Sequence, residues 1–170
     1  SNFNSEVPYE SYRENPFRFG NFTTAGEFYV ETGLSAVGMT EYRRELSLDS
    51  ARVLMQFKKD GVKYQRTSFI SYPANVLVMR FAASEKGKQN LTFSYAPNPV
   101  STGTLSAEGK DGLVYRAKLD NNQMEYVVRM RALTQGGTLQ NTDGKLRIED
   151  ADEVVFLITA DRSEERRVGK

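Results

Sequence analysis

The sequence predicts an all-β protein, an antiparallel β-sandwich of the super-sandwich type. From residue 26 onward, apolar and polar residues alternate with a period of two, and turn residues interrupt the alternation roughly every eight to twelve residues. Asp-Gly pairs at 60–61 and 143–144 separate alternating runs, as they do in tight hairpins. No long stretch carries the periodicity of an amphipathic helix. We therefore expect two packed antiparallel sheets and almost no helix beyond the N-terminal segment.

The first half of the chain is expected to contain four single strands and one hairpin. They are predicted at 26–31, 42–48, 76–83 and 91–95, with a hairpin over 51–72. In the hairpin, Asp60-Gly61 suits a type I′ turn, because both central residues of that turn take positive φ. Its polar face is expected to carry Gln65 and Arg66. Pro73 ends the hairpin, since proline cannot donate a hydrogen bond to a neighbouring strand.

The second half repeats this pattern. Strands are predicted at 113–119, 124–132, 138–141, 145–149 and 153–159. In the long strand at 124–132, the apolar face is expected inside, and Arg129 and Arg131 are expected on a solvated face. The last strand is an unbroken apolar run from Val154 to Ile158, which predicts burial on both faces.

The two ends differ from this middle part. We divide the chain into an N-terminal segment (1–22), a sandwich domain (23–161) and a tail (162–170). The tail abandons the alternation and resembles translated sequencing adaptor, so we expect it to be a cloning or assembly artefact outside the fold. The N-terminal segment is expected to pack against this domain or another, because it carries six aromatic residues: Phe3, Tyr9, Tyr12, Phe17, Phe19 and Phe22.

Composition excludes several classes of function. The 170 residues suit one domain, and 39% hydrophobic with 26% charged residues is a globular profile. A net charge of +1 speaks against a nucleic-acid partner, and no apolar run reaches the roughly 18 residues of a membrane helix. The chain has no histidine and no cysteine, which removes the usual general base, thiolate nucleophile and zinc ligands. We expect no metal and no cofactor.

Carboxylates are the remaining catalytic candidates, because glycosidases place two of them across a sugar. Acids near turns or strand ends are Glu27, Glu31, Asp120, Glu125, Glu149, Asp150 and Asp152. Isolated acids at strand ends are mostly solvated, and Asp120-Asn121-Asn122 suits a plain turn better than a calcium loop. We therefore expect no catalytic residue in this chain.

Aromatic residues near the start are the best candidates for binding. Their faces could stack on a sugar ring or pack against a second domain, and burial in the core is the competing interpretation. The candidate carbohydrate-binding or interdomain residues are Phe17, Phe19, Phe22, Glu27 and Tyr29.

Several segments together resemble a known family. They are Gly26–Val30, Tyr42–Ala51, Tyr64-x-Arg66-x-x-Phe69-x-Ser71-x-Pro73 followed by Val76–Arg80, Gly136-Gly137, and Ala151-Asp152-Glu153. In this order and spacing they resemble the N-terminal domain of glycoside hydrolase family 95, over about residues 22–161. Ala74 and Asp150 stand where that family usually has an acid and a glycine, and its opening Asn-Gly-Arg-Leu-Gly type motif is not in this sequence.

That resemblance implies a role within a larger enzyme. Family 95 comprises α-L-fucosidases, with some relatives that act on α-L-galactosides, and its catalytic groups lie in a helical domain that follows the sandwich. We therefore expect a fragment truncated at both ends, with no catalytic residue, that supports and partly walls the active site of a helical catalytic domain. Fucosylated glycans are expected ligands of the parent enzyme, and its location is expected to be periplasmic or extracellular.

Two other interpretations remain open at this stage. One is an independent carbohydrate-binding module, in which Phe17, Phe19, Phe22 and Tyr29 stack on sugar. The other is an interaction domain with no sugar ligand. Under the fragment interpretation, by contrast, no helical domain covers the aromatic segment, so we expect it to pack across a sheet face, fold back on itself or pair with a second copy. Missing opening strands would also leave a sheet edge unpaired, and we therefore expect self-association of the fragment at high concentration.

Overall fold

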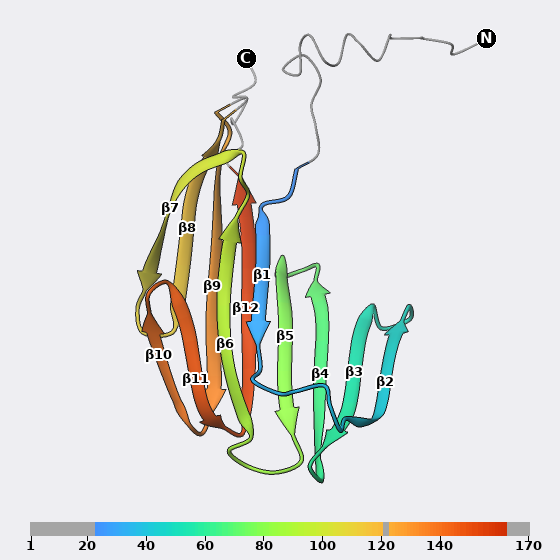
Figure 1. Cartoon of the computed structure of the whole chain (residues 1–170). Coiled ribbons are helices and arrows are strands. Elements are labelled where there is room, and N and C mark those ends of the chain that lie inside the picture. Colours follow the sequence, from blue (N-terminus) through green and yellow to red (C-terminus); the bar gives the residue numbers. More distant parts are fainter. Residues whose placement is uncertain (1–22, 121–122, 163–170) are drawn as a thin grey trace, which may run out of the picture.

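The computed structural model describes residues 23–120 and 123–162 (Figure 1). All elements in these two ranges are strands, which confirms the all-β prediction. The first six are β1 (Gly26–Glu31), β2 (Thr40–Ser47), β3 (Arg52–Lys59), β4 (Val62–Ser71), β5 (Val76–Ala83) and β6 (Gln89–Pro97). The others are β7 (Ser101–Glu108), β8 (Gly112–Leu119), β9 (Glu125–Gln135), β10 (Thr138–Thr142), β11 (Lys145–Ala151) and β12 (Glu153–Arg162). None of the described residues forms a helix that could span a membrane.

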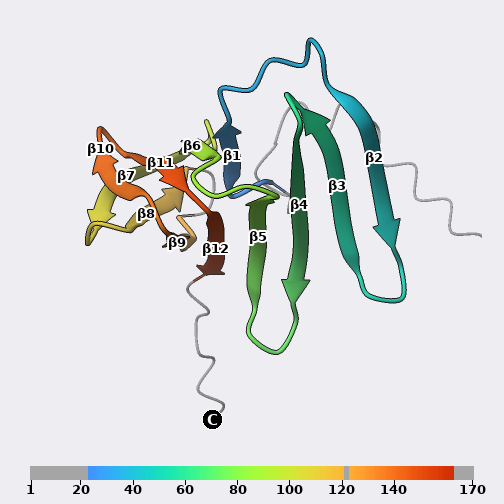
Figure 2. The same cartoon turned by 90° about the horizontal axis from the view of Figure 1, so that it is seen from below.

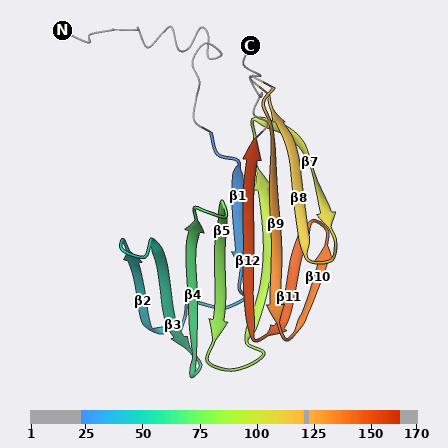
Figure 3. The same ribbon diagram turned by 180° about the vertical axis from the view of Figure 1, so that it is seen from behind.

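The strands form two antiparallel sheets of unequal size. The small sheet has the order β1-β6-β11-β10, and the large sheet has the order β2-β3-β4-β5-β12-β9-β8-β7. The small sheet lies over β12, β9, β8 and β7, while β2, β3 and β4 extend away from it (Figures 2 and 3). The architecture is therefore a sandwich over only part of the large sheet.

The main core lies between the two sheets. Its centre is Phe93 of β6 stacked on Phe156 of β12, with ring centroids 4.7 Å apart and both side chains fully buried. The predicted inner face of β9 is confirmed, because Tyr126, Val128 and Met130 are buried. Alternation along each strand thus places one row of side chains in this core.

Turn chemistry was correctly predicted at both Asp-Gly pairs. Asp60 and Gly61 have φ values of 49° and 84°, and Asp143 and Gly144 have 53° and 69°. These positive values are those of the type I′ turn, which matches the twist of the two flanking strands. Both turns join directly paired strands, β3 to β4 and β10 to β11.

Two strand predictions need correction. Strand β7 was not predicted, because its sequence Ser-Thr-Gly-Thr-Leu-Ser-Ala-Glu has little apolar content; it forms the edge of the large sheet, where most of its residues are exposed. In β12, Val154 and Phe156 are buried, but Val155 and Leu157 on the opposite face are only half-buried. The predicted burial of both faces was wrong, since the second sheet covers only one face of β12.

A second, smaller core lies on the part of the large sheet that the small sheet leaves open. Phe57 of β3 stacks on Tyr64 of β4 with a centroid separation of 5.2 Å, and Val62 completes the buried group. The connection between β1 and β2 covers it, with Leu34 and Met39 packed against these residues. The connection thus shields one end of the open face.

Candidate functional site

The outer face of β1 holds the two candidate binding residues that the structure describes. Phe28 and Val30 pack against the main core, so alternation directs Glu27 and Tyr29 outward, and Tyr29 is 48% exposed. The Tyr29 hydroxyl donates a hydrogen bond to the Glu27 carboxylate. This hydrogen bond and the negative charge of Glu27 raise the pKa of Tyr29 above its ordinary value. The pair offers an aromatic surface beside a carboxylate acceptor.

The other three candidate binding residues, Phe17, Phe19 and Phe22, lie outside the described residues. The structure therefore brings together Glu27 and Tyr29 and leaves the rest of that group as a prediction. Because Glu27 and Tyr29 are two residues apart on one strand, their common face is a consequence of the strand period alone.

Two of the acids considered for catalysis, Asp120 and Glu125, have structural partners. The Lys118 ammonium lies 2.9 Å from the Glu125 carboxylate, and the Thr102 hydroxyl donates to Asp120 over 2.9 Å. Another acid, Glu153, accepts two hydrogen bonds from the Arg80 guanidinium across the sheet. Within residues 23–120 and 123–162, no group of three or more acids is arranged to hold a metal ion.

Asp152 is part of a tight corner that joins two of the family-like motifs. Its carboxylate accepts a hydrogen bond from the Gly87 backbone amide over 2.8 Å, and its own amide donates to the Gln135 carbonyl over 2.8 Å. The Gly136-Gly137 turn lies against this corner: a Cβ on Gly137 would stand 2.2 Å from the Glu149 carbonyl oxygen. The corner also includes a bulge in β11, where Asp150 has a φ of 54°. These motif residues have a structural role.

Asn98 and its hydrogen-bond partners form a clamp that holds residues 23 and 24. Sequence reasoning missed this clamp, because Asn98 is marked there only by its place between two prolines. Asn98 is 5% exposed, and its amide nitrogen donates to the Thr23 hydroxyl and the Thr24 carbonyl. Its amide oxygen accepts from the Val100 backbone amide over 2.9 Å. Every polar group of the Asn98 side chain is therefore used.

Three tyrosines continue this clamp. Tyr95 and Tyr126 both donate to the Ala25 carbonyl, Tyr126 over 3.3 Å, and Tyr115 packs between them with ring centroids 5.3 and 5.9 Å away. Burial is the main cause that raises the pKa of Tyr95 and of Tyr126. The backbone of residues 23–25 is thus fixed by side chains from β6, β9 and the turn after β6.

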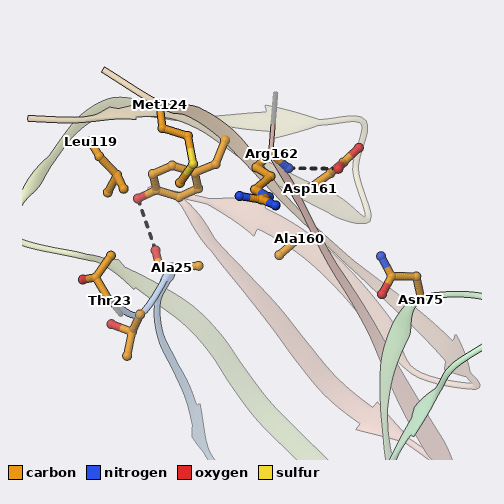
Figure 4. A pocket seen from close by; sticks show the side chains of 10 residues that line it. Thr23, Ala25, Asn75, Leu119, Met124, Ala160, Asp161 and Arg162 are labelled. Carbon is orange, nitrogen blue, oxygen red and sulfur yellow. Dashed lines mark hydrogen bonds between the residues drawn. The ribbon is translucent and has the colours of Figure 1, made fainter. Parts of the chain in front are cut away.

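A cavity of about 380 Å³ adjoins the clamp (Figure 4). Thr23, Asn75, Met124, Tyr126 and Arg162 are among its lining residues, and the dashed line to Ala25 is the hydrogen bond from Tyr126. The cavity places the start of the described chain beside the turn between β4 and β5, which contains Asn75. Asp161 is the one acid among its described lining residues, so these residues do not supply the two facing carboxylates of a glycosidase.

Arg66 departs from the sequence prediction. It lies on the inner face of β4, with its guanidinium carbon 5.3 Å from the ring centroid of Phe57 and 5.6 Å from that of Phe81. Burial lowers the pKa of this guanidinium. The prediction that Gln65 and Arg66 share the polar face was wrong for Arg66, since neighbouring residues of a strand point to opposite faces.

Comparisons with known proteins agree with this fold. The family model described as "Glycosyl hydrolase family 65, N-terminal domain" matches residues 4–165. A curated relative from Aspergillus niger, "Probable alpha-fucosidase A", is 26% identical over 152 residues, which is 84% of this chain and 18% of that protein. The solved structure of "Putative kojibiose phosphorylase from human microbiome" matches with a TM-score of 0.56 and 8% identity, over 84% of this chain and 23% of that one. The chain thus spans about a fifth of the length of these two relatives.

Proposed function

The chain belongs to the family of glycosyl hydrolase family 65 N-terminal domains, and from this premise we propose that it is the non-catalytic β-sandwich of a secreted, α-L-fucosidase-like glycoside hydrolase. In this role it supports and partly walls the active site of a helical catalytic domain. The observation that carries the proposal is the family match over residues 4–165, together with the small share of each relative that the chain covers.

The fucosidase-like specificity has two supports. The relative from Aspergillus niger carries an α-fucosidase name and is 26% identical to this chain. The segments that resemble family 95 include the Gly136-Gly137 turn and the Asp152 corner, which form one structural unit here. Residues 23–161 form the sandwich of this proposal, and a periplasmic or extracellular location goes with it.

The Glu27–Tyr29 pair is the contact that we assign to the wall. It lies on an outer face that neither sheet covers, and it combines an exposed ring with a hydrogen-bonded carboxylate. Such a pair can pack against a neighbouring domain or line the rim of a sugar site. We assign it a positioning role and no step in the chemistry.

The first experiment is to sequence the uninterrupted parent gene and express the whole enzyme. Tyr29→Ala should then raise KM for an aryl α-L-fucoside severalfold with little change in kcat, because it removes a wall and leaves the catalytic groups in place. Tyr72→Ala is the matched control, since Tyr72 is 94% exposed in the turn between β4 and β5. A parent gene with no catalytic domain, or equal effects of both variants, would refute the proposal.

A carbohydrate-binding module is the second candidate, and the exposure of Tyr29 beside an acceptor favours it. Titration calorimetry with fucosylated oligosaccharides on this chain separates the two candidates. Heat of binding that disappears in both Tyr29→Ala and Phe22→Ala would establish the module. No measurable binding, together with no turnover of aryl α-L-fucoside, agrees with the supporting domain.

A further inference from the structure

A glutamine between the two sheets has a polar group without a partner. Gln89 begins β6, and alternation places it on the inner face of the small sheet, in line with the core residues Leu91 and Phe93. Its side chain is 4% exposed, and its amide nitrogen has no hydrogen-bond partner among the described residues. Because a buried donor without an acceptor is unfavourable, this nitrogen marks a place for an acceptor.

Gln89 lines a small cavity at the seam between the two sheets. The walls of the cavity come from β6 of the small sheet, β4 of the large sheet and the connection between β1 and β2, and they include Gln89, Leu91, Tyr64, Arg66 and Thr32. The volume open to the centre of a water-sized particle is about 10 Å³, which is room for one such particle. The cavity therefore admits a water molecule or a monatomic ion, and it excludes phosphate, sulfate and sugars.

Arg66 brings a positive charge to this cavity that no acid of the described chain neutralises. Among the described residues it forms no ion pair. Its guanidinium lies over two aromatic rings and donates to the Met55 sulfur over 3.9 Å, which is a weak acceptor. Lys88, also at the wall, pairs with Glu85 over 3.7 Å, so its charge is balanced. The half-buried charge of Arg66 thus calls for a counterion.

The polar groups at the cavity can donate together to one acceptor. A guanidinium carries five N–H donors and no acceptor, and an amide nitrogen only donates. The Thr32 hydroxyl oxygen accepts from the Leu34 backbone amide over 3.4 Å, which leaves the hydroxyl proton to donate. No aspartate or glutamate is among the described lining residues. Water would accept from these donors but leave the charge of Arg66 unbalanced, whereas a halide accepts from them and balances the charge.

We propose that this cavity binds one monatomic anion, chloride in salt solution, between the Arg66 guanidinium of the large sheet and the Gln89 amide of the small sheet. The anion joins the small sheet to β4, which lies in the part of the large sheet that the small sheet leaves uncovered (Figure 2). Because the unfolded chain has no such site, the stability of the domain rises with chloride concentration. The anion site does not depend on the activity of a parent enzyme, so it and the proposed function can fail separately.

Chloride nuclear magnetic resonance measures the binding on the full chain, because a protein-bound chloride ion broadens the averaged chloride signal. We expect the broadening to fall severalfold in Arg66→Gln, which removes the charge, and in Gln89→Glu, which puts a carboxylate in the place of the anion. Arg147→Gln and Gln140→Glu are the matched controls, since each makes the same change at an exposed residue of the small sheet, and they should keep the broadening. Equal broadening in all of these proteins would overturn the proposal.

Thermal melting tests the effect on stability. Chloride at several times its Kd, in exchange for methanesulfonate at constant ionic strength, should raise the Tm of the native chain by about 2–4 °C. Methanesulfonate is too large for the cavity. The exchange should leave the Tm of Arg66→Gln and of Gln89→Glu unchanged and raise that of both controls. An equal rise in the two cavity variants would show a general salt effect and would overturn the proposal.

Bromide gives a direct test on the native chain, and this test holds even where a cavity variant fails to fold. Bromide is a monatomic anion that scatters X-rays anomalously, so it can be located in a crystal of the full chain grown in bromide salt. We expect an anomalous peak between the Arg66 guanidinium and the Gln89 amide nitrogen. Bromide only at other places in the crystal, or a water molecule in this cavity, would overturn the proposal.

Discussion

Replacing Gly137 by alanine should destabilise the domain far more than the same change at Gly33. The two glycines have nearly equal φ values, +67° and +63°, so alanine meets the same backbone penalty at both. That penalty is about 1–2 kcal/mol for an L-residue in the left-handed region. The entropy that alanine removes from the unfolded chain is also the same at both positions. The difference between the two variants therefore reports the surroundings of the added methyl group.

The two glycines differ in the space around the position of the added Cβ atom. At Gly33 nothing lies within 4 Å of the new Cβ, whereas at Gly137 it would stand 2.2 Å from the Glu149 oxygen and 2.5 Å from the Ala151 nitrogen. Both are backbone atoms of the β11 bulge and cannot move as a side chain rotamer can. Overpacking of this kind adds about 1–3 kcal/mol. We expect a loss of about 1–2 kcal/mol for Gly33→Ala and of about 2–5 kcal/mol for Gly137→Ala.

Urea unfolding followed by far-UV circular dichroism measures both values. With a slope of about 1–3 kcal/mol/M, the extra loss in Gly137→Ala moves the midpoint by roughly 1 M below that of Gly33→Ala. The slopes of the two variants should agree, since both unfold the same domain. Equal midpoints for Gly33→Ala and Gly137→Ala would refute this reasoning. They would show that the backbone around Gly137, at the corner with Asp152 and the β11 bulge, shifts at little cost in free energy.

Two further predictions follow from the clamp. Asn98→Ala should lower the free energy of unfolding by about 2–3 kcal/mol, because it leaves buried partners of Asn98 without hydrogen bonds. Gln140→Ala is the control in urea unfolding, because Gln140 is exposed on β10, and equal losses would contradict the clamp. Folding raises the pKa of Tyr95 and Tyr126 above 10.0, so it favours the neutral phenols: stability should be full below pH 10 and fall as the pH rises above it. Thermal melting from pH 8 to 11 measures this loss of stability. Tyr95→Phe should make the melting temperature fall less steeply with pH, and an unchanged fall in the variant would contradict the prediction.

The sequence alone determined most of the strands and both Asp-Gly turns. Period-two alternation predicts which side chains face the core, because successive residues of a strand point to opposite faces, and β9 follows this rule from Tyr126 to Ala132. Asp-Gly predicted both type I′ turns, since few other residue pairs take two successive positive φ values. Both signals are local, so they can be recognised without knowledge of the partner strands. Strand β7 was missed because a polar edge strand lacks the apolar half of that signal.

Only the tertiary structure decided how far the two sheets overlap. A run such as Val154–Ile158 is equally apolar whether one or both faces are covered, and the cover of β12 depends on strands distant in the sequence. For the same reason the sequence did not show that Arg66 lies over the rings of Phe57 and Phe81, nor that Asn98 holds residues 23 and 24. The candidate pair Glu27 and Tyr29 was within reach of sequence reasoning, because one strand supplies both residues. The clamp and the open face join segments tens of residues apart, and long-range pairing of this kind is fixed by packing and not by local pattern.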